Sequence, residues 1–285
     1  MPTQRTIAVT GGSGKLGRAL IPELKRRGWE VASLDTKRSD LPGARQITVD
    51  LNDFGQVVSA LHGAEAIVHL GAIPAPLGYP NATIFANNTV STYHILEAAS
   101  ILGIDKVVVG SSESSYGFAW ASNPFAPDYV PVDEDHPQKP QECYGLSKIV
   151  NEQTAAMFAR RSGMSILSLR YSMIVGVHEY AGLATRQPER YTRNLWSYID
   201  IRDAVSATIA ALEADVPGAH CLNVTADDTL SDWETERLLE HLFPEVRDIR
   251  GNVSGWQAVV SNERAKLLLG WTPVHSWTNQ PSKEE

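Results

Sequence analysis

Tyr144 and Lys148 are the two residues whose types and spacing most directly indicate chemistry. They stand four positions apart in Tyr-Gly-Leu-Ser-Lys, and the pattern around them predicts a helix over residues 144–161. On a helix this spacing puts both side chains on one face, about one turn apart. An ammonium beside a phenol stabilises the phenolate and lowers the pKa of the tyrosine from about 10. Tyr144 is therefore predicted to exchange a proton with a substrate hydroxyl.

Ser112 belongs to a serine-rich stretch, residues 111–117, that follows a predicted strand over residues 106–110. In open α/β sheets, active sites form at the carboxyl ends of the strands. A hydroxyl at this point is predicted to hydrogen-bond the reacting oxygen and to hold it toward Tyr144. A turn is the alternative for the serines, and two surface residues on a helix are the alternative for the Tyr/Lys pair. The joint occurrence of these residues with a glycine-rich turn favours catalysis.

That turn is Thr-Gly-Gly-Ser-Gly-Lys-Leu-Gly, residues 10–17, between a buried strand and an amphipathic helix. Glycines permit a tight turn and the close approach of a pyrophosphate to the free N–H groups of a helix N-terminus. The residues predicted to bind a dinucleotide here are Gly11, Gly14, Lys15, Leu16 and Gly17. The alternative is a glycine-rich turn without a ligand.

Asp35 ends the second predicted strand about 20 residues beyond the glycines, where a carboxylate accepts hydrogen bonds from the adenosine ribose. A carboxylate repels a 2′-phosphate and favours NAD, whereas Lys37 and Arg38 leave NADP open. Asp50 is a candidate partner for the adenine amino group, with a helix cap as the alternative. Leu51 is expected to pack on the adenine ring.

The elements that must position these residues alternate between strand and helix. Apolar runs predict strands over residues 6–10, 30–35, 45–49, 66–70, 106–110 and 165–170. Helical spacing predicts helices over residues 15–27, 54–61, 83–102, 144–161 and 201–212, with a later strand over 219–224, a helix capped by Ser231 and a last helix from about Ser261 to Gly270. This rhythm predicts a doubly wound parallel α/β sheet, a Rossmann fold, with a small C-terminal substrate lobe.

The predicted domain boundaries follow from the places where the rhythm breaks. Residues 1–172, joined again by 198–225, are expected to bind NAD(P), and residues 173–197 and 226–285 to form the substrate lobe. Residues 118–140 predict a long functional loop. Its aromatic residues either line a pocket or pack locally, and the second is the commoner case; they are Trp120, Phe125 and Tyr129.

Composition excludes several classes of function. The 285 residues carry a formal net charge of −8 and no Lys/Arg block, which argues against nucleic-acid binding. Two cysteines without metal-ligand spacing predict reduced thiols and no metal site, and His69 and His94 are expected to pack rather than to bind metal. No signal segment or apolar run long enough to span a membrane is present, so a soluble cytoplasmic protein is expected.

Together these motifs resemble the extended short-chain dehydrogenase/reductase family, the NAD-dependent epimerase/dehydratase group, over nearly the whole chain. The matching segments are the glycine turn, His69-Leu70-Gly71-Ala72, Asn88 with Thr92 and 96–99, Ser112 before Tyr116-Gly117, the Tyr144/Lys148 pair, Leu169-Arg170, 198–203 and 269–273. The resemblance implies NAD as cofactor, Tyr144 as acid/base, and contacts to the cofactor from Leu70, Gly71, Ala72 and Asn88. For Asn88, an amide on the helix face is the alternative. It also implies a homodimer formed by residues 83–102 and 144–161.

The choice of reaction rests on Glu113 and Ser114 and on the segment after the sixth strand. Dehydratases of this family carry an acid pair where this chain has Glu113 and Ser114, so one carboxylate is missing. Nucleotide-sugar epimerases use a longer segment than residues 171–197, which favours a smaller substrate. The pattern resembles the uronate dehydrogenase branch, which implies substrate contacts from Ile73, Glu113, Ser114, Met173 and Arg193, with Arg193 binding a carboxylate. We therefore expect oxidation of a sugar or sugar acid, with an NAD-dependent epimerase and a non-catalytic dinucleotide sensor as alternatives.

Overall fold

The computed structural model describes residues 5–279 and is built around one seven-stranded sheet in which every pair of neighbouring strands is parallel. In spatial order the strands are β3 (Arg45–Thr48), β2 (Glu30–Asp35), β1 (Thr6–Thr10), β4 (Ala66–His69), β5 (Lys106–Ser112), β6 (Ser165–Tyr171) and β9 (Ala219–Val224). The predicted fold class is confirmed. Because the strand order reverses between β1 and β4, their carboxyl ends form the crevice in which open α/β sheets bind ligands.

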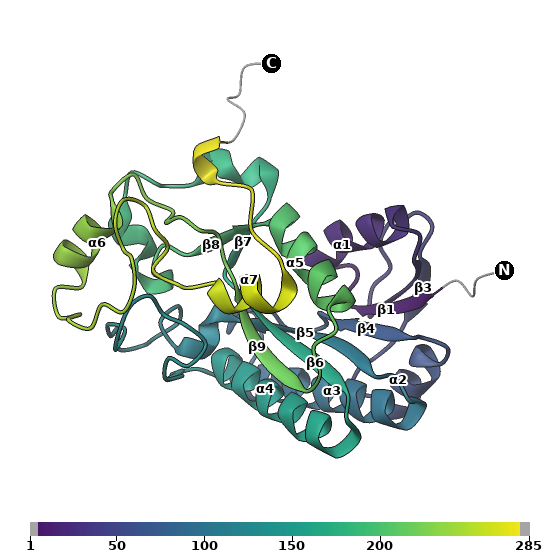
Figure 1. The fold of residues 1–285 in the computed structure, drawn as a ribbon. Coiled ribbons are helices and arrows are strands. Elements are labelled where there is room, and N and C mark those ends of the chain that lie inside the picture. The colour runs from purple at the N-terminus through teal and green to yellow at the C-terminus, as the bar shows by residue number, and fades with distance from the viewer. Residues whose placement is uncertain (1–4, 280–285) are drawn as a thin grey trace.

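Helices cover both faces of the sheet, as Figure 1 shows. One layer contains α1 (Lys15–Arg26), α5 (Ile201–Glu213) and α7 (Glu263–Leu269), and the other contains α2 (Phe54–Leu61), α3 (Asn81–Leu102) and α4 (Cys143–Ser162). Alternation along β1 divides its side chains between two cores: Ile7 and Val9 pack under α1, and Ala8 packs on the opposite face. Burial on both faces explains why the inner strands β1 and β4 read as apolar runs, whereas the edge strand β3 is mostly polar and partly exposed.

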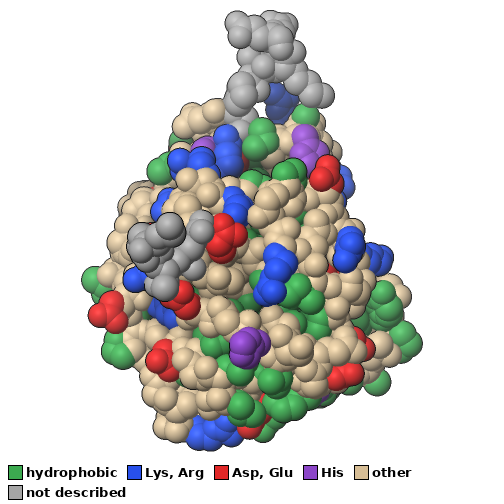
Figure 2. Space-filling view, turned by 90° about the vertical axis from the view of Figure 1, so that its right-hand side faces the viewer, with side chains coloured by type: hydrophobic (Ala, Val, Ile, Leu, Met, Phe, Trp, Pro, Cys, Tyr) green, Lys and Arg blue, Asp and Glu red, His purple; other side chains and the backbone are tan. Residues whose placement is uncertain are grey.

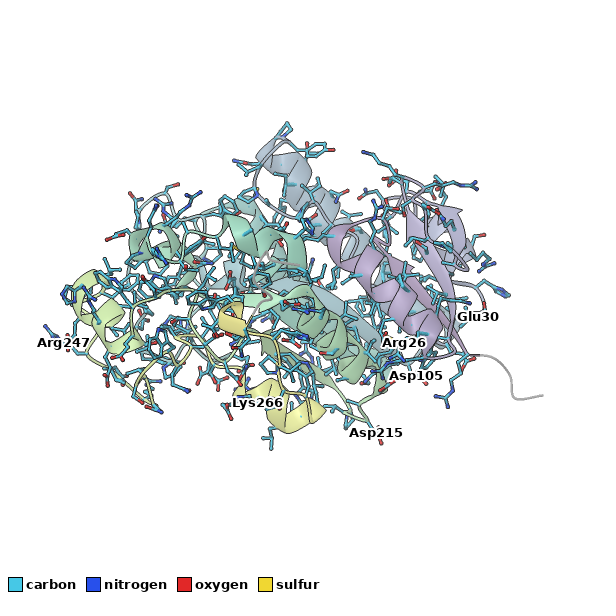
Figure 3. The ribbon with its side chains drawn as sticks, turned by 90° about the horizontal axis from the view of Figure 1, so that it is seen from above. Arg26, Glu30, Asp105, Asp215, Arg247 and Lys266 are labelled. Carbon is cyan, nitrogen blue, oxygen red and sulfur yellow. The ribbon has the colours of Figure 1, made fainter. Side chains whose placement is uncertain are left out.

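A second region lies beyond the carboxyl ends of the strands. It contains the parallel pair β7 (Met173–Val175) and β8 (Tyr198–Asp200), the helix α6 (Thr235–Leu242), and the 3-10 segments η1 (Glu113–Tyr116), η2 (Val177–Gly182), η3 (Pro188–Asn194) and η4 (Trp277–Asn279). Buried aromatic residues such as Trp196 and Tyr116 form its core. In Figure 3, Arg247 beside α6 lies opposite Glu30 and Asp105 at the amino ends of β2 and β5, so the strands run toward this region.

One expectation about local structure was wrong. Ser231 does not cap a helix, because α6 begins only at Thr235 and the Ser231 hydroxyl accepts a hydrogen bond from Trp233 N at 3.1 Å. The loop over residues 118–140 is confirmed as irregular backbone, joined to the later chain by bridges at Val130 and Val132.

The surface carries charges of both signs. Figure 2 shows acidic and basic side chains interspersed over one face. Among the described helices, none combines the length and apolar character required to cross a bilayer. Within residues 5–279 no group of three or more His, Cys, Asp or Glu side chains is arranged to hold a metal ion, and Cys143 and Cys221 are free thiols.

Candidate active site

A cavity of about 1190 Å³ opens at the carboxyl ends of the central strands. Its walls come from the glycine turn, the ends of β2, β4, β5 and β6, the start of α4 and the η3 segment. The volume exceeds the roughly 300–1,000 Å³ of ordinary small-molecule pockets. A dinucleotide and a small substrate can therefore share it.

In the glycine turn, backbone atoms occupy the space that a side chain at Gly11 or Gly17 would need. Gly11 has φ +66°, and a Cβ there would lie 2.7 Å from the Leu70 carbonyl carbon. A Cβ on Gly17 would lie 2.4 Å from the Gly11 carbonyl oxygen. Gly14 precedes α1 without a side-chain cap, so N–H groups of the first turn remain free to bind an anion. The turn thus fits a dinucleotide pyrophosphate, and Gly11, Gly14, Lys15, Leu16 and Gly17 all line the cavity.

Asp35 holds the glycine turn against the end of β2. Its carboxylate accepts hydrogen bonds from Ser13 N at 3.0 Å and from Lys37 N at 3.1 Å. The Ser13 hydroxyl in turn donates to the Lys37 carbonyl oxygen at 2.7 Å. Asp35 and Lys37 line the cavity, so the acid predicted to favour NAD and one of the two cations compatible with NADP lie at the same place.

Asp50 and Leu51 line the cavity on the far side of β2. The helix-cap alternative for Asp50 is wrong, because Asp53 caps α2 by accepting from Gln56 N at 3.1 Å. Asp50 instead accepts a hydrogen bond from Asn52 N at 2.9 Å. Gly71 makes room for the Leu51 side chain, since a Cβ on Gly71 would lie 2.5 Å from Leu51 Cδ1.

His69, the last residue of β4, lies beneath the cavity and bonds to neighbouring elements. His69 Nδ1 lies 2.7 Å from Thr10 Oγ1, and its Nε2 lies 3.0 Å from Thr92 Oγ1. Burial, reinforced by the charge of Lys148, lowers the pKa of His69 to about 3 and keeps the ring neutral. His69 is therefore a packing residue, as expected. The residues that follow it line the cavity; they are Leu70, Gly71, Ala72 and Ile73.

Asn88 is the one predicted site residue that does not line the cavity. Its side chain accepts a hydrogen bond from Ile73 N at 2.8 Å and donates to the Ile73 carbonyl at 3.0 Å and to Ser147 Oγ at 3.3 Å. Asn88 is fully buried and fixes the loop after β4 against α4. Its predicted contact with the cofactor is replaced by this support of Ile73, which does line the cavity.

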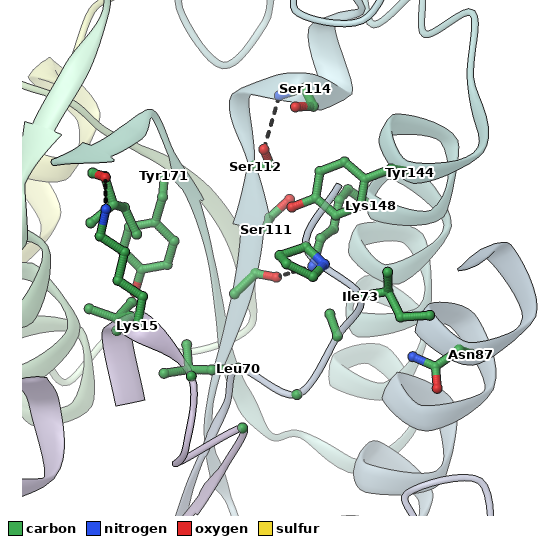
Figure 4. A pocket seen from close by; sticks show the side chains of 18 of the residues that line it. Lys15, Leu70, Ile73, Asn87, Ser111, Ser112, Ser114, Tyr144, Lys148 and Tyr171 are labelled. Atoms are coloured by element: carbon green, nitrogen blue, oxygen red, sulfur yellow. Dashed lines mark hydrogen bonds between the residues drawn. The ribbon is translucent and has the colours of Figure 1, made fainter. Parts of the chain in front are cut away.

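Ser112, Tyr144 and Lys148 meet at the centre of the cavity, each less than one tenth exposed (Figure 4). Ser112 ends β5, while Tyr144 and Lys148 begin α4. Lys148 Nζ donates to the Gly110 carbonyl at 2.8 Å and lies 5.4 Å from the centre of the Tyr144 ring. Burial lowers the pKa of Lys148 to about 8.

The electrostatics of Tyr144 differ from the sequence-based expectation. Burial raises its pKa to about 12, a hydrogen bond with Ser112 lowers it, and the carboxyl groups of Glu142 and Glu113 raise it further. The expected lowering by Lys148 is not found: burial of the phenolate dominates, and the Lys148 ammonium is hydrogen-bonded to the Gly110 carbonyl. The chain's own groups hold Tyr144 as a phenol.

Three residues that support this centre were not recognised from the sequence: Ser111, Glu142 and Glu152. The Glu142 carboxylate caps α4 by accepting from Tyr144 N at 2.5 Å and Gly145 N at 2.6 Å. The Glu152 carboxylate accepts from Ser111 Oγ at 2.6 Å and forms a buried two-pronged ion pair with Arg170 at 2.8 Å. The sequence could have indicated two of them: Glu142 is an acid two residues before Tyr144, and Glu152 is an acid one helical turn after Lys148.

The substrate end of the cavity is built from loops. Glu113, Ser114, Met173 and Arg193 all line it. The Glu113 carboxylate accepts a short hydrogen bond from Ser197 Oγ, and burial raises its pKa to about 7. Arg193 Nη1 donates to the Ala121 carbonyl at 3.0 Å.

Aromatic side chains also form part of the wall at the substrate end of the cavity. Trp120 and Tyr79 line the cavity, and both are exposed. Phe125 instead packs on Phe118, with ring centres 5.0 Å apart, and Tyr129 packs on a neighbouring histidine ring. The loop thus supplies Trp120 to the cavity, while Phe118, Phe125 and Tyr129 pack locally.

Comparison with known proteins relates the chain to one enzyme family. The model of the NAD dependent epimerase/dehydratase family matches residues 7–224. A UDP-glucose 4-epimerase of Corynebacterium glutamicum is 27% identical, over 95% of this chain and 91% of the relative. A uronate dehydrogenase of Pseudomonas putida is 28% identical, over 83% and 81%. A solved UDP-galactose 4-epimerase superposes with a TM-score of 0.72 at 27% identity, over 96% and 95% of the two chains.

Proposed function

Because this chain belongs to the NAD-dependent epimerase/dehydratase family, we propose that it is an NAD-dependent oxidoreductase acting on a hydroxyl of a sugar or sugar acid. One observation carries the proposal: Ser112, Tyr144 and Lys148 line a single cavity together with the glycine turn. Hydride transfer requires a dinucleotide site and a proton-exchanging group that face the same substrate.

The residues proposed to hold NAD lie along the cavity from the glycine turn to β4. Gly11, Gly14 and Gly17 admit the pyrophosphate, and Asp35 accepts from the ribose. Asp50 and Leu51 form the adenine end. When bound, NAD supplies the hydride acceptor. NADP remains the second candidate because Lys37 also lines the cavity.

The chain's own residues provide the proton chemistry. Ser112 donates a hydrogen bond to the substrate oxygen and orients it toward Tyr144. Tyr144 first loses its own proton to solvent, and its phenolate oxygen then takes the hydroxyl proton as the carbon gives up a hydride to NAD and becomes a carbonyl. Lys148 stabilises the phenolate from within the same buried pocket. Burial of all three side chains keeps water away from the reacting atoms.

The substrate end supports a small polyhydroxylated acid. Arg193 is an exposed cation that lines the cavity and has no acidic partner among the described residues. A planar guanidinium suits a carboxylate. Glu113 also faces the cavity, and its raised pKa weakens its repulsion of an acidic substrate. Ser114 stands where dehydratases carry their second acid, so dehydration is disfavoured.

A nucleotide-sugar epimerase is the second candidate. It is favoured by the similarity to a UDP-glucose 4-epimerase across 95% of this chain. An epimerase keeps its NAD and forms no net NADH, whereas a dehydrogenase releases NADH.

The organisation of the protein is proposed to follow the chemistry. Residues 1–172 and 198–225 would bind NAD, and residues 173–197 and 226–285 the substrate.

Exposed apolar side chains on α3 and α4 favour a homodimer formed by these helices; they are Val90, Tyr93, Ile101 and Leu146. Light scattering would report the dimer, and substitution of Tyr93 by Asp would shift it to monomer. The free thiols fit a cytoplasmic location, which cell fractionation would test.

The test is a panel of free sugars, sugar acids and nucleotide sugars incubated with the enzyme and NAD. Net NADH, followed by its absorbance, is expected with a free sugar or sugar acid. Conversion of a nucleotide sugar without net NADH would establish the epimerase instead. NAD binding with no turnover across the panel would identify a dinucleotide sensor.

A further inference from the structure

Lys15 joins the cofactor turn to the segment on the other side of the cavity. It is the first residue of α1, and its ammonium donates to the Ile174 carbonyl at 2.7 Å and to Glu179 Oε2 at 2.5 Å. The same Glu179 oxygen accepts a hydrogen bond from Gly176 N at 2.6 Å. Figure 4 shows the Lys15 side chain extended along one wall of the cavity, with its nitrogen in a hydrogen bond.

Ile174 belongs to the paired strand β7, whereas η2, which follows it, has few anchors: its Tyr180 packs against the buried cluster that contains Val175 and Tyr198. No residue of η2 is buried, and Val177 is exposed. Its other polar anchor is Tyr180, whose hydroxyl donates to Asp200 Oδ2 at 2.8 Å and so ties η2 to the end of β8. A segment with few buried contacts opens locally at low cost in free energy.

We propose that Glu179 is a positioning residue for cofactor exchange: by holding Lys15 across the cavity, it keeps η2 closed against the dinucleotide turn. The proposal rests on the NAD site proposed above. Both side chains of the ion pair are about two fifths exposed, so the contact is a weak surface pair. Such a contact closes the cavity and still opens within a catalytic cycle, as an enzyme that releases NADH requires.

The contact also changes what Lys15 does. A lysine beside free helix N–H groups would ordinarily act as an extra anion ligand. Here its ammonium is already bound to a carboxylate and a carbonyl on the opposite wall. Lys15 therefore serves closure of the cavity, and its loss of contact with Glu179 accompanies opening.

The experiment is stopped-flow measurement of NADH binding and release by the full chain, followed by NADH fluorescence. Glu179→Gln removes the charge but keeps an oxygen that can accept from Gly176 N. Association and dissociation rates are expected to rise together, each about threefold as for loss of a weak surface pair, with the equilibrium affinity unchanged. At about 1 M salt, where the screening length is roughly 3 Å, the difference from wild type should shrink.

A control is Glu263→Gln, which removes a surface ion pair with Lys266 on α7, away from the cavity. It should leave both rates unchanged. Unaltered rates in Glu179→Gln would overturn the proposal, as would tighter binding, which would make Glu179 a competitor for Lys15. A wild-type protein that binds no NADH would instead refute the proposed function.

Discussion

The two ends of the cavity are built in different ways. At the dinucleotide end, closely packed backbone segments determine the shape of the cavity: Gly11 lies against Leu70, and Gly17 lies against Gly11. At the substrate end, side chains on 3-10 segments and loops form the wall; Glu113, Trp120 and Arg193 are examples. The first end tolerates almost no substitution, whereas the second can be altered without disturbing the sheet.

This difference separates what the family shares from what this enzyme selects. A backbone cradle recognises a pyrophosphate, which every dinucleotide carries. Arginine, carboxyl and aromatic groups on loops recognise features that differ between substrates. Substitutions at the first end should therefore abolish cofactor binding, and substitutions at the second should change which substrate is used.

The largest effect is expected at Gly17. Gly17→Ala places a Cβ 2.4 Å from a backbone oxygen, so α1 must move away from the turn. NADH affinity should fall by at least about 100-fold, or about 2.7 kcal/mol. Fluorescence titration measures it, with circular dichroism to verify folding. Gly55→Ala is the control, because a Cβ there makes an ordinary contact at 3.4 Å.

Lys148→Met should lower kcat by about 100-fold, within the range for loss of proton-transfer assistance. NADH should still bind through the glycine turn. Because the phenolate of Tyr144 would lose a nearby cation, the rise of the oxidation rate with pH should move to higher pH. Unchanged turnover with an unchanged pH profile would remove Lys148 from the mechanism.

Arg193→Ala tests the substrate end. KM for a sugar acid should rise about 10-fold, the loss of roughly one charge-assisted hydrogen bond, while kcat and NADH affinity change little. Steady-state kinetics with a sugar acid and the matching neutral sugar separates the carboxylate contact from general damage. Arg186→Ala, an exposed arginine outside the cavity, is the control.

At Glu113 the expected effect is on stability and not on activity. Its folded-state pKa is raised to about 7 from 4.5, so the folded protein holds the proton more tightly than the unfolded chain. The stability from this proton is present below pH 4.5 and is lost as pH rises toward 7. Glu113→Gln avoids that loss and should raise the free energy of unfolding at pH 8 by about 1–3 kcal/mol. Thermal unfolding at pH 5 should show no gain.

The dinucleotide end was largely predictable from the sequence. The glycine spacing, Asp35 and the Tyr144/Lys148 pair are local patterns on elements with strong periodicity. Each of them lies on the cavity wall. Asn88 was misassigned because sequence position gives the helix face but not the partner, which proved to be the Ile73 backbone.

The substrate end was less predictable because its contacts join residues far apart in the chain. Glu113 meets Ser197 and Lys15 meets Glu179 only through the fold. The raised pKa of Tyr144 likewise depends on burial, which a one-turn spacing to Lys148 does not reveal.

The central claim is that the Tyr144 oxygen exchanges the substrate proton while the rest of the chain holds NAD. Turnover of Tyr144→Phe, measured on the substrate identified by the panel and alongside NADH titration, tests it most directly. We expect a loss in kcat of at least about 1,000-fold, with NADH affinity and melting temperature close to wild type. Near-normal turnover by Tyr144→Phe would contradict it.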